Sequence, residues 1–257
     1  MRRDVTRRVI CIASLSALVL SSCGAPQPPA ASKLTVAAAA NLARVLDEVG
    51  AAFRKQTGIE VVLSYGSTAQ LSQQIDNGAP FDVFAAADTE HVDQLIQKGR
   101  LVAGSRAIYA RGQLALWIPD SEKSGVREVK GLTRPEIRFI AIAQPALAPY
   151  GEAAVEAMKA SGLWEALQPK IVYANDIRMA RQFAATGNAD AAFTAYSLVL
   201  KESGTVVKIN PKLYRAIDQA LGVVSSSRRP DLARQFVDFL LGSEGRSILG
   251  KSGYLVL

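Results

Sequence analysis

Cysteine and histidine are scarce in this chain, and their scarcity excludes several kinds of site. The 257 residues include two cysteines and one histidine. Cys11 lies in an apolar segment that we expect to be cleaved off, which leaves Cys23 with no partner for an intrachain disulfide or a cysteine metal cluster. His91 stands among polar residues in TEHVDQ, where we expect a surface position rather than a catalytic or metal-binding role.

Enzyme and nucleic-acid signatures are also missing. No GxGxxG and no GxSxG occur, and we expect the glycines to form no P-loop. We therefore expect neither nucleotide binding nor a Ser-His-Asp hydrolase. The formal charge is +7, but the basic residues beyond the N-terminal segment are scattered, so we expect no nucleic-acid partner. About half of the residues are hydrophobic, which predicts a folded chain with one large core or two modest ones.

The first 32 residues have the order of a lipoprotein leader. MRRDVTRR is basic, VICIASLSALVL is apolar but short for a permanent membrane span, and LSSC at residues 20–23 resembles a lipobox. We expect residues 1–22 to be a signal peptide, Cys23 the lipidated first residue, and the Pro/Ala-rich residues 23–32 a tether. The alternatives are an ordinary signal peptide with a chance cysteine, and twin-arginine rather than Sec export. Either way we expect an exported protein, periplasmic or on the cell surface.

From Lys33 onward, apolar strands alternate with amphipathic helices. The helix expected over residues 41–57 places apolar side chains on one face and stops at Gly58. Continuous apolar strands separated by helices indicate an α/β fold of mainly parallel sheets covered on both faces. We expect two such lobes, joined by strand-like crossovers near residues 105–116 and 212–226. Lobe 1 would take residues 33–110 and 220–257, and lobe 2 residues 111–219.

Small or polar residues recur where an expected strand ends and the next helix begins. Two such junctions fall in each lobe. The four segments are AAAANLARV with Asn41 as the expected N-cap, YGSTAQL with Ser67 and Thr68 as caps, QPALAPYGEAAV with Pro149-Tyr150-Gly151 before a helix expected from about Glu152, and YANDIRMAR with Asn175 or Asp176 as cap and Ile177 in the first turn.

These junctions suit an anion. A helix start presents backbone N–H groups without intrahelical acceptors, and ligands of parallel α/β sheets bind at the carboxyl ends of strands. Two facing lobes would enclose an anion between four helix starts, with Asn41, Thr68 and Tyr150 as side-chain donors. Ser, Thr, Asn and Asp are also ordinary helix caps, so a single junction is weak evidence. Tyr150 is not a capping residue, which favours a ligand there.

Three segments resemble the molybdate-binding proteins of bacterial ABC importers. They are VAAAANLARVLDEVGAAFRKQTG, LSYGSTAQLSQQIDNGAPFDVFAAAD and IAIAQPALAPYGEAA, and the similarity runs from about Lys33 to the C-terminus. The resemblance implies two α/β lobes that close by a hinge on molybdate or tungstate. It also implies that neutral hydrogen-bond donors hold the oxyanion, with no cofactor, no direct metal-ion ligand and no enzyme activity.

The ligand positions of that family fall on four residues of this sequence. The resemblance implies that Asn41, Thr68, Tyr150 and the backbone of Ile177 bind the oxyanion. Ala40 and Ser67 are their possible neighbours. Some members place a tyrosine at the position of Ala195, where Tyr196 is adjacent; we favour Tyr150 as the phenol and leave Tyr196 open.

The implied function is that of a receptor. A monomer would capture molybdate, and tungstate with it, and deliver it to an inner-membrane ABC permease with its cytoplasmic ATPase. One alternative is a receptor for sulfate, phosphate or ferric iron. Another is an exported α/β enzyme acting on an anionic ester, which needs a nucleophile or base that the junctions do not offer. Asp82 and Asp88 flank a strand, and we expect Asp82 to be structural.

Overall fold

The computed structural model of the protein describes residues 33–119 and 125–256. The expected signal peptide (1–22), the tether (23–32) and the lipidation site Cys23 lie outside these residues and stay predictions. Within the described ranges, no helix combines the length and the apolar character that a membrane span requires. The described residues belong to one compact unit.

The strands of the described residues form two five-stranded sheets. The first sheet has the order β2-β1-β3-β10-β4, and the second has the order β7-β6-β8-β5-β9. In chain order the strands are β1 (Lys33–Ala39), β2 (Glu60–Gly66), β3 (Val83–Ala85), β4 (Ala107–Gly112), β5 (Leu114–Ile118), β6 (Ile140–Ala143), β7 (Ile171–Ala174), β8 (Ala191–Ala195), β9 (Thr205–Lys208) and β10 (Ile217–Val223).

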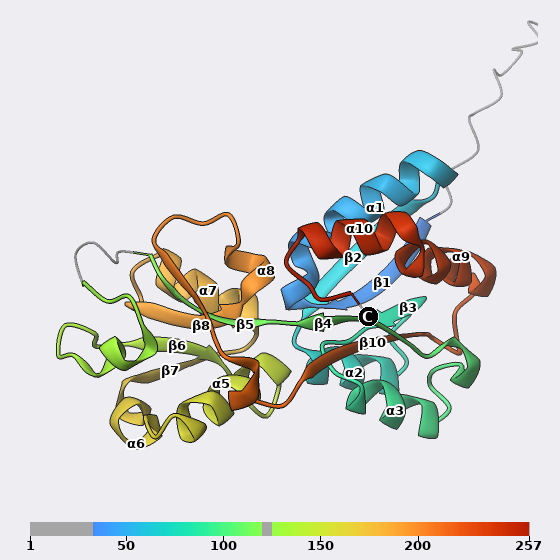
Figure 1. Ribbon diagram of the computed structural model, residues 1–257. Coiled ribbons are helices and arrows are strands. Elements are labelled where there is room, and N and C mark those ends of the chain that lie inside the picture. Colours follow the sequence, from blue (N-terminus) through green and yellow to red (C-terminus); the bar gives the residue numbers. More distant parts are fainter. Residues whose placement is uncertain (1–32, 120–124, 257) are drawn as a thin grey trace, which may run out of the picture. The chain divides into compact units, whose positions relative to one another are not determined.

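Helices and short 3₁₀ turns connect these strands (Figure 1). The α-helices are α1 (Ala43–Thr57), α2 (Thr68–Asp76), α3 (Glu90–Gln97), α5 (Pro149–Ala160), α6 (Trp164–Leu167), α7 (Ile177–Ala185), α8 (Tyr196–Val199), α9 (Pro230–Leu241) and α10 (Ser243–Lys251). The 3₁₀ turns are η1 (Ala40–Leu42), η2 (Ala103–Ser105), η3 (Val129–Thr133), η4 (Gln168–Lys170) and η5 (Pro211–Leu213).

Helix α1 forms where the apolar spacing predicts it. Val45, Leu46, Val49 and Phe53 are buried along one face, and the helix ends at Gly58, whose φ of 74° is the left-handed conformation that glycine adopts readily. The Phe53 ring meets Phe236 of α9 edge to face, with the ring centroids 5.4 Å apart.

Both faces of each sheet are covered, which explains the continuous apolar strands. On β1, Val36 and Ala38 pack in the core that also holds Val45 and Phe53, whereas Ala37 packs on the opposite side with α2 and α3. The second sheet is covered in the same way by α5 on one face and α7 on the other. Because successive strand residues face opposite sides, every position of such a strand must be apolar.

The expectation of two α/β lobes with mainly parallel sheets is confirmed, with one antiparallel strand in each sheet. β1 pairs in parallel with β2 and β3, and β6 in parallel with β7 and β8. β10 is antiparallel to β3 and β4, and β5 is antiparallel to β8 and β9. The antiparallel strands have a topological cause: β5 and β10, which enter a sheet from the other lobe, run against the first strands of that sheet.

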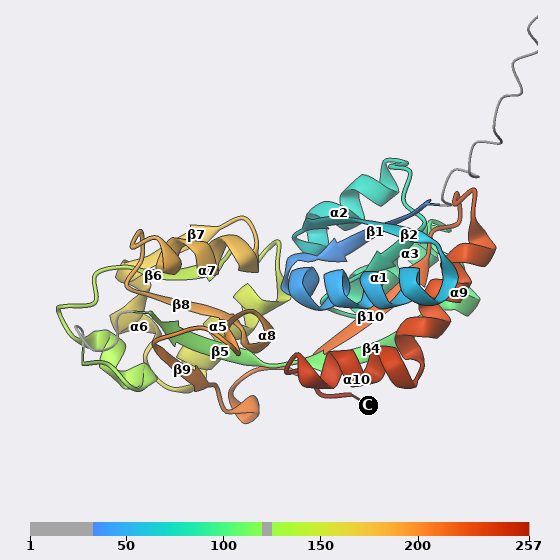
Figure 2. The same ribbon diagram turned by 90° about the horizontal axis from the view of Figure 1, so that it is seen from above.

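Strands carry the chain between the lobes, as predicted. β4 of the first sheet runs on into β5 of the second with only Gln113 between them, and β10 brings the chain back to the first sheet (Figures 1 and 2). The first sheet thus uses residues 33–112 and 217–223, and the second uses residues 114–208. The lobe limits at residues 110 and 220 stay a prediction.

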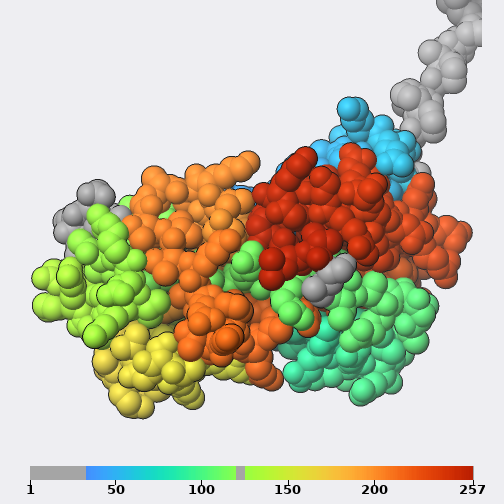
Figure 3. Space-filling model, viewed as in Figure 1, coloured from blue at the N-terminus to red at the C-terminus, as the bar shows by residue number. Residues whose placement is uncertain are grey.

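The C-terminal segment is tied to one of these crossover strands. Leu255 pairs with Arg111 of β4 through two backbone hydrogen bonds, of 2.8 Å and 3.0 Å. Figure 3 shows the C-terminal helices (red) lying against the segment that follows β8 (orange). The end of the chain therefore contacts the connection between the lobes and the second lobe itself.

Candidate oxyanion-binding site

The four junctions meet at one small cavity. It is lined by the ends of β1 and β2, the loop after β3, and the starts of α2, α5 and α7. Every residue of the expected ligand set contributes to its wall: Ala40, Asn41, Ser67, Thr68, Tyr150 and Ile177. Ala39, Gly66, Ala87, Ala148, Pro149 and Asp176 complete the lining.

Strand register brings the junctions together. In the first sheet Ala39 lies opposite Gly66 in the parallel pair of β1 and β2. In the second sheet Ala143 lies opposite Ala174 in the parallel pair of β6 and β7. Parallel strands that end at the same level place their following residues at one edge of the sheet. Each lobe therefore presents two helix starts at the cavity.

At the first junction the expectation that Asn41 caps a helix is wrong. Asn41 lies inside η1, and its side chain caps neither η1 nor α1. Its Nδ2 donates to Gln219 Oε1 at 2.9 Å and to Tyr254 Oη at 3.0 Å. An amide nitrogen has two hydrogens, so these buried acceptors occupy both.

At the second junction the two hydroxyl residues have different roles. Ser67 is the N-cap of α2, and its Oγ accepts from the Gln70 N–H at 3.4 Å. Thr68 is not a cap; its Oγ1 accepts from the Ala87 N–H at 3.1 Å. In both bonds the hydroxyl is the acceptor, so each hydroxyl hydrogen is available for a ligand in the cavity.

At the third junction the helix begins earlier than expected, at Pro149 rather than near Glu152. Proline suits the first helical position because its ring presets φ and the missing N–H would have no partner there. Tyr150 is thus the second residue of α5 and is 1% exposed. Burial raises the pKa of its phenol well above the ordinary value, so the group stays neutral and keeps its hydrogen.

The glycine after Tyr150 permits the close approach of this helix start to β6. A Cβ on Gly151 would lie 2.1 Å from the carbonyl oxygen of Ala143, the last residue of that strand. Any larger residue would push the start of α5, and Tyr150 with it, away from the end of the strand.

At the fourth junction the expectation is confirmed. Asp176 caps α7 by accepting from the Met179 N–H at 2.8 Å, and Ile177 is the first helical residue. The N–H of a first helical residue has no acceptor within its own helix. The backbone of Ile177 can therefore donate to a bound anion at the positive end of the helix dipole.

The chemistry of this cavity is that of neutral hydrogen-bond donors. Asp176 is the one charged residue in its wall, and its carboxylate is engaged in capping α7. Within the described ranges, no cluster of three or more His, Cys, Asp or Glu residues could hold a metal ion. The cavity suits a ligand that accepts hydrogen bonds and donates none.

The tyrosine beside Ala195 does not line the cavity. The Tyr196 ring lies under the ammonium of Lys208, 4.0 Å from the ring centroid, and beside Gly253. Ala195 is fully buried at the end of β8. Of the two tyrosines considered from the sequence, only Tyr150 lies at the meeting point of the junctions.

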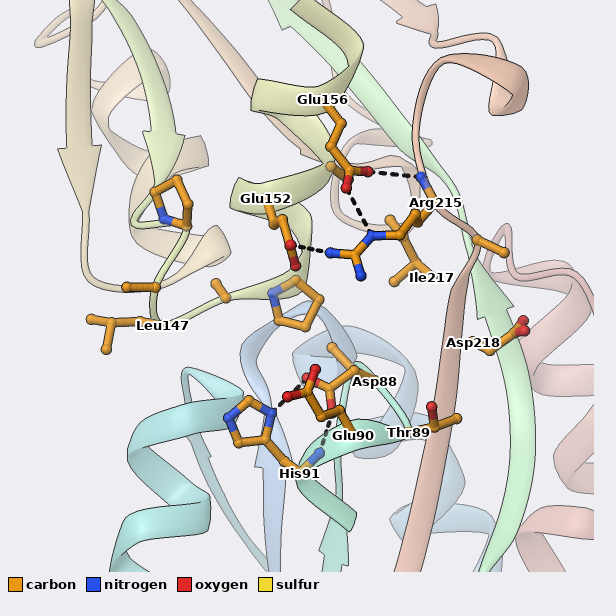
Figure 4. A pocket seen from close by; sticks show the side chains of 17 residues that line it. Asp88, Thr89, Glu90, His91, Leu147, Glu152, Glu156, Arg215, Ile217 and Asp218 are labelled. Atoms are coloured by element: carbon orange, nitrogen blue, oxygen red, sulfur yellow. Dashed lines mark hydrogen bonds and ion pairs between the residues drawn. The ribbon is translucent and has the colours of Figure 1, made fainter. Parts of the chain in front are cut away.

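A second, wider cavity adjoins the start of α5, and it has the wrong charge for an anion (Figure 4). Arg215 is paired there with Glu156, 2.8 Å from Nε to Oε1, and with Glu152. Asp88, Glu90 and Asp218 add further carboxylates. Negative side chains outnumber positive ones around this space, which disfavours an anion there.

His91 is half-buried in the wall of the charged cavity, which corrects the expectation of a surface position. Its Nδ1 lies 2.8 Å from Asp88 Oδ2. That hydrogen bond raises the pKa of His91 above its ordinary value against the opposing effect of burial. The pair stands at the start of α3 and has no serine nucleophile in its cavity wall.

Asp82 is structural, as expected. It is buried, and its Oδ2 accepts from the Thr35 N–H at 2.8 Å and from the Thr35 hydroxyl at 2.9 Å. It immediately precedes β3, whereas the cavity lies where the strands of this sheet end. Its role is to join β1 to the loop before β3.

Direct contacts join the two lobes around the neutral cavity. The Ala69 N–H of α2 donates to the Leu147 carbonyl at 3.2 Å. Arg44 of α1 forms an ion pair with Glu202, which follows α8. These contacts bridge the segments that flank the first and second sheets.

One motif was missed in the sequence. GRSILGKS, residues 245–252, has the spelling GxxxxGK[ST] of a P-loop. A P-loop requires a loop between a strand and a helix, but Gly245 to Lys251 lie inside helix α10, which follows helix α9. The backbone N–H groups of a continuous helix cannot cradle a phosphate, so the match does not indicate nucleotide binding.

Two lobes of mixed sheet, with a donor-lined cavity where their helix starts meet, define a solute-binding protein. The chain belongs to the family described as bacterial extracellular solute-binding protein, whose model matches residues 34–255. The molybdate-binding protein ModA of Rhodobacter capsulatus is 37% identical over 233 residues, which cover 90% of this chain and 92% of that protein. The ModA of Azotobacter vinelandii is also 37% identical, over 87% of this chain and 90% of its own length.

Solved structures agree on the fold. The periplasmic molybdate-binding protein of Azotobacter vinelandii superposes with a TM-score of 0.83 at 33% identity, covering 87% of this chain and 99% of that one. The sulfate-binding protein SubI of Mycobacterium tuberculosis H37Rv superposes with a TM-score of 0.72 at 17% identity, covering 87% and 86%. The second likeness concerns the fold alone.

Gln219, which lies behind the cavity, was not predicted from the sequence. Gln219 of β10 is fully buried and contacts Asn41, Tyr109 and Tyr150. The sequence does contain a signal for Gln219: a glutamine within the mostly apolar strand IDQALGV needs buried hydrogen-bond partners. The identity of those partners depends on tertiary structure and cannot be read from local sequence.

Proposed function

We propose that this chain is the substrate-binding component of a bacterial ABC importer for molybdate. In this proposal Asn41, Thr68, Tyr150 and Ile177 bind the oxyanion, with Ala40 and Ser67 beside it. Asn41 and Ile177 donate through their backbone N–H groups, because both side-chain amide hydrogens of Asn41 are already taken. The observation that carries the proposal is the meeting of all these residues at one cavity of neutral donors. The molybdate-binding relatives at 37% identity support the choice of cargo.

Neutral donors are sufficient for this ligand. Molybdate is a doubly charged tetrahedral anion that only accepts hydrogen bonds at neutral pH. Each charge-assisted hydrogen bond contributes about 1.5–3 kcal/mol, so several from both lobes support tight binding. Phosphate carries a proton at neutral pH and needs an acceptor, which this set of donors lacks. Tungstate has the charge and shape of molybdate, and we propose that it binds as well.

Closure of the lobes is the mechanism that we propose for capture and delivery. Donors of both lobes reach one anion, so the closed state binds it more tightly than the open state does. The strands between the lobes serve as the hinge. The closed form then docks on an inner-membrane permease, whose cytoplasmic ATPase drives import. We further propose that a lipid on Cys23 anchors a monomer at the membrane.

The proposed role is binding without catalysis and without a cofactor. The one carboxylate in the cavity wall, that of Asp176, caps a helix and is not placed as a general base. A ferric-iron receptor is disfavoured because iron prefers deprotonated phenolates, whereas the buried tyrosines around this cavity keep their phenol hydrogens at neutral pH. Burial raises the pKa of Tyr109 and Tyr150 well above the ordinary value, and it raises that of Tyr254 to about 12.

Thermal unfolding of the chain without its first 23 residues tests the cargo. Molybdate, tungstate, sulfate and phosphate are added in turn to the protein. At 100 times its Kd a ligand adds about 2.7 kcal/mol to the free energy of unfolding and raises Tm. We expect molybdate and tungstate to raise Tm and phosphate to leave it unchanged. A shift with sulfate instead would make the protein a receptor for another oxyanion, and no shift with any of them would contradict the oxyanion site.

A further inference from the structure

Gln219 holds two side chains of the cavity from behind. It lies on the crossover strand β10 and is fully buried. Its Nε2 donates to Tyr150 Oη at 3.0 Å, and its Oε1 accepts from Asn41 Nδ2 at 2.9 Å. We propose that Gln219 is the positioning residue that directs the phenol hydrogen of Tyr150 into the cavity, and that it thereby sets the affinity for the oxyanion. This inference rests on the proposed function.

The direction of the hydrogen bonds carries the argument. A phenol has one hydrogen and can also accept. Because Gln219 donates to Tyr150, the oxygen of the phenol acts as acceptor toward β10, and its hydrogen is not consumed there. The hydrogen can then be donated to an anion in the cavity that Tyr150 lines.

Asn41 reinforces this assignment. Its Nδ2 hydrogens are occupied by Gln219 and Tyr254, so its side chain has no further hydrogen for the anion. Gln219 therefore acts on the ligand through Tyr150: its bond to the phenol oxygen determines whether the phenol hydrogen faces the cavity. Asn41 in turn orients the Gln219 amide, since its donated hydrogen fixes the oxygen end of that amide.

The backbone around Gln219 is shaped for this contact. The pairing of β10 with β4 shifts register between Gln219 and Ala220, an irregularity that re-aims a strand side chain. On the facing strand, a Cβ at Gly112 would lie 2.1 Å from Tyr150 Oη and 2.5 Å from Gln219 Nε2. The phenol and the amide fill the space that the missing side chain leaves. The phenol of Tyr150, which is the donor in question, therefore packs directly against the crossover strands β4 and β10.

The glutamine amide meets the demands of this position. It must donate to Tyr150 and accept from Asn41 at the same time, without placing a charge behind a bound anion. A carboxylate would accept from Tyr150 and draw the phenol hydrogen away from the cavity. Methionine has a similar volume but makes neither strong bond.

The decisive experiment measures molybdate binding by calorimetry to the wild-type protein, Gln219→Glu and Gln219→Met. Gln73→Glu is the matched control, because Gln73 lies exposed on α2 and the charge change is the same. We expect Gln219→Met to lose about 10-fold in affinity and Gln219→Glu about 100-fold or more near pH 8, with Gln73→Glu unchanged.

The pH profile separates positioning from mere packing. The ionisable groups that face the Gln219 amide are the phenols of Tyr109 on β4 and Tyr150 on α5, with Tyr254 one hydrogen bond further. All three stay protonated near neutrality. The introduced carboxyl of Gln219→Glu becomes protonated as the pH falls and can then donate again. Its deficit relative to wild type should therefore shrink from about pH 8 to about pH 6, whereas that of Gln219→Met should stay constant.

A double-mutant cycle with Tyr150→Phe gives a second readout. If Gln219 acts through the phenol, Gln219→Met costs less affinity in the Tyr150→Phe background than in wild type. The Tm values of the ligand-free variants show which of them fold. If Gln219→Glu does not fold, the double-mutant cycle with Gln219→Met still tests the inference. Equal losses in both backgrounds, or wild-type affinity of Gln219→Met, would overturn the inference while leaving the proposed function intact. Failure of the wild-type protein to bind molybdate would instead overturn the proposed function.

Discussion

The phenol of Tyr254 accepts a hydrogen bond from the side-chain amide of Asn41 at 3.0 Å, across 213 positions of the chain. It also donates to the Asn41 carbonyl at 2.8 Å and contacts the Ser197 hydroxyl at 3.0 Å. Asn41 belongs to the first junction of the cavity, and Ser197 lies on α8 beyond the second sheet. One residue near the C-terminus therefore joins both lobes behind the proposed ligand.

Replacing Tyr254 with phenylalanine should loosen this connection. Tyr254→Phe leaves one buried Asn41 Nδ2 hydrogen without its acceptor and removes the phenol bond to the Asn41 carbonyl, which costs about 1–3 kcal/mol of folding free energy. Urea unfolding of the ligand-free protein measures the loss. The control is Tyr173→Phe, since the Tyr173 side chain is 47% exposed on the edge strand β7. Equal stability of Tyr254→Phe and the control would show that the bonds of Tyr254 contribute little.

Tyr150 and Tyr196 can be distinguished directly. Tyr150→Phe removes the phenol donor and should weaken molybdate binding by about 1–3 kcal/mol, roughly tenfold or more. It also leaves the buried Gln219 Nε2 without its acceptor, so binding is compared at a temperature where both variants are fully folded. Tyr196→Phe should leave binding unchanged, because its ring lies against Lys208 and Gly253 and outside the cavity wall. Calorimetric titration of both variants gives the answer. A loss confined to Tyr196→Phe would move the phenol donor to that residue.

Much of the fold follows from local sequence. The buried face of α1 and its end at Gly58 are set by the spacing of apolar residues and by the left-handed conformation that glycine allows. The proximity of Asn41 to Thr68, and of Tyr150 to Ile177, also follows, because parallel strands expose their carboxyl ends at one edge of each sheet. These features depend only on neighbours in sequence and on general sheet geometry.

The remaining features depend on distant partners. Asn41 was expected to cap a helix because asparagine often does, but acceptors on Gln219 and Tyr254 occupy its amide hydrogens. The antiparallel entry of β10 into the first sheet is likewise a result of the crossovers between the lobes. The early start at Pro149 was open to prediction, since proline is common at the first helical position.

His91 should make the fold pH-dependent in a defined direction. Its folded-state pKa is raised above 6.5 chiefly by the hydrogen bond with Asp88. A raised pKa means that the stabilising contribution is fully present below pH 6.5 and is lost as the pH rises through the folded-state value. The stability difference between the wild-type protein and His91→Gln should therefore narrow from about pH 6 toward about pH 9.

The His91 titration can be read without interference, because it is the only histidine in the chain. Its imidazole carbon protons give one histidine signal set in a proton NMR titration. A measured pKa above 6.5 in the wild-type protein, returning toward 6.5 in Asp88→Asn, is the expected result. A wild-type value below 6.5 would mean that burial outweighs the bond to Asp88.

Gly112 offers a test that reaches the cavity from the crossover strands without removing any hydrogen-bonding group. The Cβ of Gly112→Ala would fall 2.1 Å from Tyr150 Oη and 2.5 Å from Gln219 Nε2, so both must move. Overpacking of this kind costs about 1–3 kcal/mol of stability, and displacement of the phenol should also weaken molybdate binding about tenfold or more.

The matched control for Gly112→Ala is Gly104→Ala in η2, where an added Cβ would meet no atom within 4 Å. Unfolding and calorimetric titration of both variants separate the two effects. The Gly112 variant should lose affinity even at temperatures where it is fully folded, because the donor itself is displaced. If it keeps wild-type affinity, then the hydrogen bond of Tyr150 does not depend on its contact with the crossover strands. The cavity would in that case be positioned by the helix starts alone.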